Sequence, residues 1–164
     1  MARTTTGKAP YVSEDDLEIT LATQTGVNAL RNKCVLYFSH FLGLRAKELS
    51  MLKVGDVYDV KKGKLKDIIR LLGNITKGNR YREVFLVNPI ARSLVEEYIT
   101  KERPKDPDAP LFLSQKGGPF SPNSMVTMIN NCYKKAGIQA TSHSGRRSFA
   151  TRLITVSYTH LRAH

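Results

Sequence analysis

One apolar stripe limits the folds open to this chain more than any other feature of its sequence. Between Gly26 and Gly43, apolar side chains recur at every third or fourth position: Val27, Leu30, Cys34, Val35, Phe38 and either Phe41 or Leu42. That spacing places them on one face of an α-helix, and such a face must be covered by other parts of the chain. The sequence therefore predicts a helix that packs into a hydrophobic core and ends at Gly43.

Residues typical of helix ends predict further helices on both sides of the stripe. Helix starts are indicated at Ser13 with Asp16, at Asn88-Pro89 and at Ser121-Pro122, and a helix end at Gly137. A last helix is predicted to begin near His143.

The segment RAKELSMLKV, directly after Gly43, is predicted as another helix. Its Leu49 and Leu52 have the spacing of an inward face, and Gly55 is expected to end it.

The pattern changes between residues 64 and 87. KLKDIIRLLGNI and YREVFLV are rich in branched and aromatic residues, and they flank TKGNR, in which Gly78-Asn79 can supply a turn. The sequence predicts a β-hairpin here, with Lys77 at its tip. The expected fold is mainly α with a small antiparallel β-sheet (α+β), because helices surround this one β region.

The length of 164 residues suits one domain. Residues 1–12 are expected to form a flexible N-terminus and residues 13–154 the domain. Cys34 and Cys132 lack the spacing of a zinc site or a disulfide framework and are expected to be packed thiols.

Charge favours a polyanionic partner. The chain has 26 Lys and Arg residues against 14 Asp and Glu residues, a formal net charge of +12. Nucleic acid is the first expectation and an acidic membrane surface the second. No run of about twenty apolar residues could span a bilayer, and the N-terminus lacks the apolar centre of a secretory signal. We therefore expect a cytoplasmic protein.

Three polar clusters could carry chemistry. Arg45 and Glu48 are separated by one helical turn, as are His143 and Arg146, so each pair can act on one ligand. Lys77 on the hairpin is followed by Arg80 and Arg82. Taken singly, each cluster is more typical of solvated surface charge than of a site.

The combination of the three clusters, in this order on helix, hairpin and late helix, resembles the catalytic domain of the tyrosine recombinase (phage integrase) family. FLGLRAKELSMLKVGDV is similar to that family's first arginine box, TKGNRYREVFL to its hairpin lysine, and SHSGRRSFATRL to its His-x-x-Arg box. The resemblance covers roughly residues 13–154. It implies site-specific DNA recombination through a 3′-phosphotyrosine intermediate, with double-stranded DNA as partner.

The resemblance implies a role for each residue. Arg45 and Arg146 would hold the non-bridging phosphate oxygens, since forked guanidiniums match that charge without a metal ion or other cofactor. Lys77 would protonate the leaving 5′-oxygen, and His143 would accept the phenol proton or bind the phosphate. Glu48 is expected to orient a neighbour. Phosphate contacts outside the catalytic centre are expected from Arg80, Arg82 and Arg147.

A nucleophilic tyrosine should follow, and SYTHL looks like the family's Tyr-x-His stretch. Tyr158, however, comes only 158 − 146 = 12 residues after Arg146. The family places a turn and a further helix between the two, which needs on the order of twenty-five residues. On one continuous helix Tyr158 would lie about 18 Å along the axis from Arg146. We therefore expect Tyr158 to be a decoy and the nucleophile to be absent from the chain.

The tail has a second peculiarity. VSYTHLRAH, residues 156–164, is one reading frame of a transposon-end adapter used in shotgun sequencing, GTC TCT TAT ACA CAT CTC CGA GCC CAC. The adapter begins with CT ahead of this frame, and Thr155 fits a codon ending in CT. Residues 155–164 are accordingly interpreted as a sequencing artefact.

The resemblance also implies missing parts. Family members have an N-terminal helical domain that closes around DNA, and they act as tetramers, whereas this chain by itself is expected to be monomeric and inactive. Without the final helices, Phe149 and Leu153 should be poorly buried. Two alternatives remain open: DNA relaxation by a type IB topoisomerase, and a non-catalytic basic DNA- or RNA-binding module.

Overall fold

The computed structural model describes residues 9–73 and 80–163, and side chains up to residue 154. Its helices are α1 (Glu14–Ala22), α2 (Ala29–Leu42), α3 (Ala46–Met51), α4 (Val54–Val57), α5 (Pro89–Glu102), α6 (Pro122–Lys135) and α7 (Ser144–Ala163). Its strands are β1 (Tyr58–Asp59), β2 (Lys64–Leu65), β3 (Ile68–Leu71) and β4 (Arg82–Phe85). The predicted fold class, mainly α with a small antiparallel β part, is confirmed.

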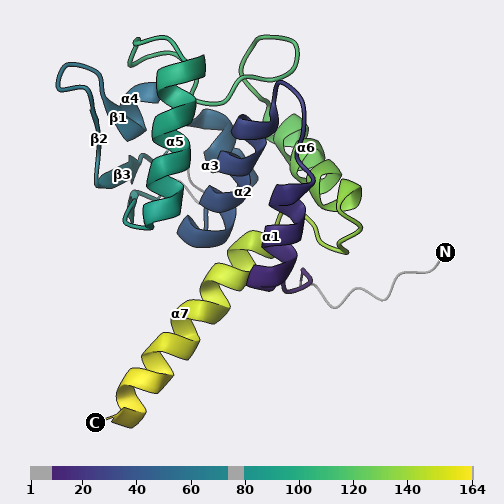
Figure 1. The fold of residues 1–164 in the computed structure, drawn as a ribbon. Coiled ribbons are helices and arrows are strands. Elements are labelled where there is room, and N and C mark those ends of the chain that lie inside the picture. The colour runs from purple at the N-terminus through teal and green to yellow at the C-terminus, as the bar shows by residue number, and fades with distance from the viewer. Residues whose placement is uncertain (1–8, 74–79, 164) are drawn as a thin grey trace.

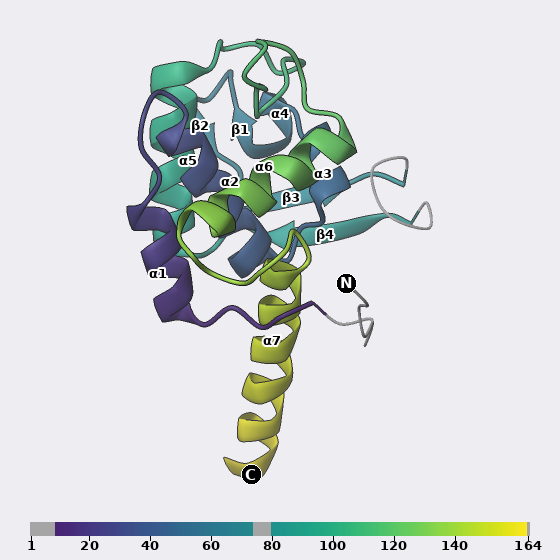
Figure 2. The same cartoon turned by 90° about the vertical axis from the view of Figure 1, so that its right-hand side faces the viewer.

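Helix α2 occupies the centre of the domain, as its apolar stripe predicts. It packs against α7, α5, α3, α6 and α1, and Figures 1 and 2 show the other elements arranged around it. Cys34, Val35 and Phe38 are fully buried. Val27, which the stripe included, is 87% exposed because it precedes the first residue of the helix.

The predicted helix starts are confirmed by their hydrogen bonds. Ser13 Oγ accepts from the backbone N–H of Asp16 at 3.0 Å. Asn88 Oδ1 accepts from two N–H groups in the first turn of α5, at 3.0 and 2.9 Å. Ser121 Oγ accepts from the third residue of α6 at 3.0 Å. Each side chain satisfies an N–H that has no partner inside its helix, so these boundaries could be predicted locally.

The prediction of one helix ending at Gly55 is wrong. Helix α3 stops at Met51 and Gly55 lies inside the separate helix α4. The loop before residue 112 takes the backbone hydrogen bonds here: Gly55 N–H donates to the Pro107 carbonyl at 2.9 Å. A Cβ on Gly55 would lie 2.7 Å from Cβ of Pro107. Glycine is therefore needed for close approach of that loop and not for a helix end. Leu49 and Leu52 are buried as expected.

The strands form two antiparallel pairs in the described residues. β3 pairs with β4, with Ile68 opposite Phe85 and Leu71 opposite Arg82, which confirms the predicted hairpin strands. Lys77 and the predicted Gly78-Asn79 turn lie outside the described residues. The β1–β2 pair was not predicted, because strands of two residues leave almost no periodic signal. Lys64–Leu65 were expected in the first strand of the hairpin and instead form β2.

The N-terminal segment is held against α7. Val12 is fully buried, its N–H donates to Ser148 Oγ at 2.9 Å, and that hydroxyl donates back to the Val12 carbonyl at 2.8 Å. The flexible terminus expected for residues 1–12 therefore does not extend to Val12. The reason is a contact 136 residues apart in sequence, which no local pattern reveals.

Helices α2 and α7 approach each other closely at two glycines. Gly43 ends α2 in the left-handed region with φ 67°, and a Cβ there would lie 2.4 Å from the Phe149 ring. A Cβ on Gly145 would lie 2.2 Å from Ser39 Oγ and 3.0 Å from the Ser39 carbonyl carbon. The two helices can therefore meet only where these side chains are missing.

Beyond this contact α7 leaves the body of the domain, and both views show its C-terminal part projecting alone (Figures 1 and 2). Leu153 is 53% exposed, in agreement with the expectation, whereas Phe149 is half-buried against Gly43. The helical backbone runs without interruption from Ser144 to Ala163.

Both cysteines are buried free thiols, as expected, and burial raises the pKa of Cys132 to about 11. Within residues 9–73 and 80–163, no helix is long and apolar enough to cross a membrane.

We predict that Gly43→Ala costs more stability than Gly26→Ala. Both glycines have positive φ, 67° and 83°, but a Cβ at Gly26 meets nothing within 4 Å. Gly26→Ala should therefore lower the free energy of unfolding by about 1 kcal/mol through backbone strain alone. Gly43→Ala should lower it by about 2–4 kcal/mol, since Phe149 must also move. Urea unfolding measures both, and equal losses would show that Phe149 yields at no cost.

We also predict that stability falls as the pH drops from about 6.5 to about 4. Burial, and next the nearby Arg152 charge, lower the pKa of His40 from 6.5 to about 4. In this window the unfolded chain takes up a proton that folded His40 does not, so protonation favours unfolding. The loss should approach 3 kcal/mol, and His40→Gln should remove it. Unfolding curves across the window measure this; equal pH slopes in the two proteins would contradict it.

Candidate active site

Arg45 stands where α2 gives way to α3. Two residues after the left-handed Gly43, it forms the N-cap of α3 in extended conformation, with φ −78° and ψ 158°. Its side chain is 30% exposed. The sharp break between the helices thus presents a guanidinium at the surface on a rigid helix start.

Glu48 lies one turn further on, and its carboxylate is completely buried. Its Oε1 accepts the backbone N–H of Arg45 at 2.8 Å, which satisfies an otherwise unpaired donor at the start of α3. Its Oε2 lies 3.6 Å from Nη1 of Arg45. A buried carboxylate is costly unless it is paired, so Glu48 requires cations around it.

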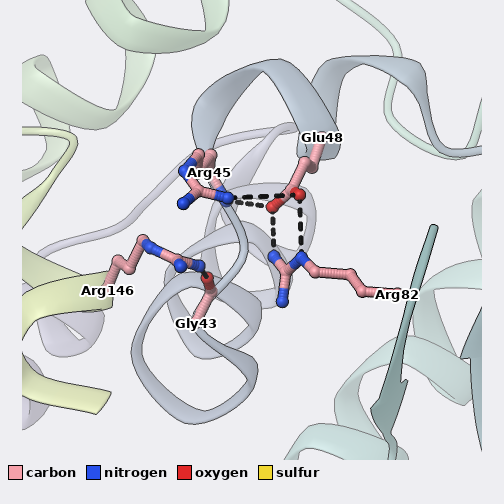
Figure 3. A network of polar contacts seen from close by, with 5 residues as sticks. All are labelled: Gly43, Arg45, Glu48, Arg82 and Arg146. Carbon is pink, nitrogen blue, oxygen red and sulfur yellow. Dashed lines mark hydrogen bonds and ion pairs between the residues drawn. The ribbon is translucent and has the colours of Figure 1, made fainter. Parts of the chain in front are cut away.

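Arg82, the first residue of β4, supplies the closest of these cations. Its Nε donates to Glu48 Oε2 at 3.1 Å and its Nη2 donates to Oε1, a two-pronged pair that joins β4 to α3 (Figure 3). Along β4, Arg82 is half-buried and Val84 is buried, whereas Glu83 and Phe85 are exposed. The alternation of the strand therefore turns Arg82 toward the helices.

Arg146 reaches the same place from the first turn of α7. Its Nη1 donates to the Gly43 carbonyl at 2.6 Å, so the end of α2 holds this side chain as well (Figure 3). Burial, and next the charges of Arg45 and Arg82, lower the pKa of Arg146, while Glu48 raises it. The arginines of the first, second and third sequence clusters thus meet at one point.

The cluster Arg45, Glu48, Arg82 and Arg146 combines three positive charges with one negative charge. Among the described residues, the Arg45 guanidinium makes one ion pair and no hydrogen bond, and that of Arg146 makes one hydrogen bond. Most of their N–H groups therefore remain for a ligand, and the excess positive charge selects an anion. Two forked guanidiniums fit the oxygens of a phosphate group.

The remaining predicted residues are less closely gathered. His143 is exposed in the turn just before α7, not on the helix itself, and its carbonyl accepts the Arg147 N–H at 3.0 Å. Arg147 is half-buried, with its Nε enclosed and unpaired among the described residues. Arg80 is exposed ahead of β4, and Lys77 lies outside the described residues.

Two parts of the arrangement escaped sequence reasoning. The acceptor for Arg146 is a backbone carbonyl, that of Gly43, which has no residue signature. The pairing of Arg82 with Glu48 joins residues 34 positions apart. Strand alternation could have indicated that Arg82 shares the inward face of Val84, but not which partner it meets.

A cavity of about 640 Å³ lies elsewhere, with Arg31, Phe120 and Lys135 among its lining residues, and it includes no residue of the cluster. In the part of the chain that the structure describes, no group of three or more His, Cys, Asp or Glu residues could hold a metal ion.

Comparison with known proteins identifies the family of this chain. A family model described as the phage integrase family matches residues 11–159. The tyrosine recombinase XerC of Methylobacterium nodulans is 32% identical over 143 residues, which cover 86% of this chain and 40% of the relative. The tyrosine recombinase XerD of Corynebacterium glutamicum is 30% identical over 130 residues, 76% of this chain and 40% of the relative.

Solved structures share the fold. The XerA recombinase matches with a TM-score of 0.70 at 24% identity, over 93% of this chain and 52% of that one. The XerH site-specific recombinase in its post-cleavage complex with a palindromic difH substrate matches with a TM-score of 0.68 at 23% identity, over 96% and 46%. The catalytic core of lambda integrase matches with a TM-score of 0.63 at 11% identity, over 86% and 81%.

The chain spans about 40% of the length of these curated relatives. The family match covers nearly all of the described residues, including the α2–α3 break, the β3–β4 hairpin strands and the start of α7. This chain therefore belongs to the phage integrase family, the family of the tyrosine recombinases.

Proposed function

We propose that this chain is part of the catalytic domain of a site-specific DNA recombinase, and that the cluster Arg45, Glu48, Arg82 and Arg146 binds the phosphate that is cut. The observation that carries the proposal is the meeting of Arg45 and Arg146, 101 residues apart (146 − 45), around the end of α2 with most of their N–H groups unoccupied by described residues.

The proposed chemistry conserves the energy of the phosphodiester. A tyrosine oxygen attacks the phosphorus, a bond from this oxygen to phosphorus forms, and the bond to the 5′-oxygen breaks. The leaving 5′-oxygen takes a proton and later returns as the nucleophile, so the second step reverses the first. No oxidant, hydrolytic water or cofactor is required.

The arginines contribute by opposing the charge that grows on the phosphate. The five-coordinate phosphorus carries additional negative charge on its non-bridging oxygens, and fixed guanidiniums stabilise that state more than the substrate. Burial and the adjacent cations already lower the pKa of Arg146. An incoming phosphate would relieve this unfavourable clustering of positive charge, which favours phosphate binding at this point.

Proton transfer is assigned to two residues outside the cluster. Lys77, five residues before Arg82 in sequence, is proposed to protonate the leaving oxygen. His143 is proposed to accept the phenol proton or to bind the phosphate, and its exposed position before α7 leaves it accessible to DNA. Contacts to neighbouring phosphates are proposed for Arg80 and Arg147.

Tyr158 is proposed not to be the nucleophile. Because α7 is continuous from Ser144 to Ala163, residue 158 lies about 18 Å along the helix axis from Arg146, at about 1.5 Å per residue. A nucleophile must come within about 3.5 Å of the phosphorus. We also propose that residues 155–164 are adapter-derived. Sequencing the source DNA past the Ile154 codon without the adapter tests this proposal.

The proposed partner is double-stranded DNA. XerH, one structural neighbour, was solved bound to its difH substrate, and the net charge of +12 suits such a partner. We further propose that the whole protein acts as a tetramer in the cytoplasm and that this chain by itself is monomeric.

We predict that Arg146→Gln, in a full-length protein carrying this domain, lowers the rate of strand cleavage by about 10²–10³-fold while DNA binding is largely kept. The matched control is Arg103→Gln. Arg103 also donates to a backbone carbonyl, that of Pro110, at 3.1 and 2.7 Å. These hydrogen bonds involve no residue of the cluster, so the variant loses a comparable interaction away from the candidate site. Cleavage on a nicked duplex and binding by fluorescence anisotropy measure the two effects. Parallel loss of both would indicate a binding module instead.

We also predict that the 164-residue chain forms no covalent adduct with a nicked suicide DNA substrate, since Tyr158 cannot reach the phosphate held by Arg146. Denaturing gel electrophoresis and mass spectrometry detect an adduct. An adduct that maps to Tyr158 would overturn both the decoy assignment and the adapter interpretation.

A further inference from the structure

We infer that Arg82 is a positioning residue, which neutralises Glu48 so that Arg45 keeps its N–H groups for the phosphate. The inference rests on the proposed function of the cluster. It differs from the contact to the DNA backbone that the sequence suggested for Arg82, and it assigns the residue a task inside the protein.

The two arginines that face Glu48 bind its carboxylate to different extents. Arg82 addresses both carboxylate oxygens with Nε and Nη2, whereas the guanidinium of Arg45 approaches one oxygen only to 3.6 Å (Figure 3). Two parallel N–H donors on one carboxylate are the strongest arrangement that arginine offers. Glu48 is thus satisfied chiefly by Arg82.

Because Glu48 is buried, its carboxylate requires the pairing with Arg82. The Glu48 side chain has no exposed surface, so its charge must be matched inside the protein. If Arg82 were removed, the nearest remaining guanidinium would be that of Arg45, already in ion-pair contact. Its side chain would then turn fully onto the carboxylate, and its donors would be lost to a phosphate.

The position of Arg82 in its strand fits the same role. The residue opens β4, pairs across the sheet with the buried Leu71, and its side chain is 27% exposed on the inward face. Two of the five N–H groups of Arg82 bind Glu48. A guanidinium fixed in this way on a buried carboxylate cannot turn to follow a DNA phosphate without giving up that pair. Its charge nevertheless adds to the positive field that acts on Arg146.

A double-mutant cycle in DNA binding tests the inference. Affinity for a short fluorescent DNA duplex is measured at one salt concentration for four proteins: the unchanged 164-residue chain, Arg82→Gln, Glu48→Gln and the double variant. With Glu48 present, Arg82→Gln should weaken binding about tenfold, because Arg45 is drawn away; with Gln at position 48 the same change should cost less than about twofold. Gln still accepts the Arg45 backbone N–H. Circular dichroism at the assay temperature verifies that each variant is folded.

Conservative and matched variants sharpen the result. Arg82→Lys keeps the charge but loses the fork, and it should recover only part of the affinity. Arg70→Gln is the control: Arg70 lies on the adjacent strand β3, pairs with Glu83 at 3.1 Å at the surface and contacts no member of the cluster. It removes the same charge and should change the affinity less than about twofold.

The outcomes separate this inference from the proposed function. An equal loss on Arg82→Gln in both backgrounds means that Arg82 contacts phosphate directly, and no loss in either means that it has no role; both overturn the inference. Arg45→Gln, measured alongside, should also weaken binding by the 164-residue chain, because it removes the donors that the inference reserves for the phosphate. If it does so while the cycle is additive, only the role of Arg82 is wrong. If Arg45→Gln leaves the affinity unchanged, this inference falls, whereas the proposed function is tested separately by the cleavage rate of Arg146→Gln.

Discussion

The buried carboxylate of Glu48 is the constraint around which the rest of the cluster is arranged. A charge without exposed surface is tolerated only when hydrogen bonds and opposite charges surround it. Glu48 obtains them from the backbone of α3, from Arg45 and from Arg82 on β4. One acidic side chain thereby joins a helix start to a strand that comes much later in the sequence, and it sets which arginine is committed and which is left for a ligand.

Close packing of α2 and α7 positions Arg146, the second arginine of the proposed phosphate site. Gly43 and Gly145 leave no room for a Cβ, so the two helices meet at backbone distance. At this contact the carbonyl of Gly43, the residue that caps α2, accepts a hydrogen bond from Arg146. The stability of the core and the orientation of the candidate catalytic arginine therefore depend on the same few atoms.

The proposed chemistry follows from this arrangement and from family membership together. The positive excess of the cluster favours a phosphate, and the relatives are named tyrosine recombinases. The long helix α7 has Arg146 in its first turn, and Tyr158 follows about 18 Å further along the helix axis. Geometry thus argues for a nucleophile other than Tyr158, in agreement with the unusual sequence of the tail.

The sequence by itself determined the features that depend on neighbouring residues. Helix starts at Ser13, Asn88 and Ser121, the helix end at Gly43 and the fold class could all be predicted, because caps and apolar periodicity act within a few residues. The family resemblance also came from short boxes around Arg45 and His143.

Tertiary structure decided what depends on contacts between distant segments. It split the expected helix at Leu52, since the loop near Pro107 takes over the backbone hydrogen bonds. It also gave Arg82 its partner and Arg146 its carbonyl acceptor. Such pairings arise only after the chain has packed, when burial compels each charge to find an opposite charge or a hydrogen-bond partner, wherever in the sequence that partner lies.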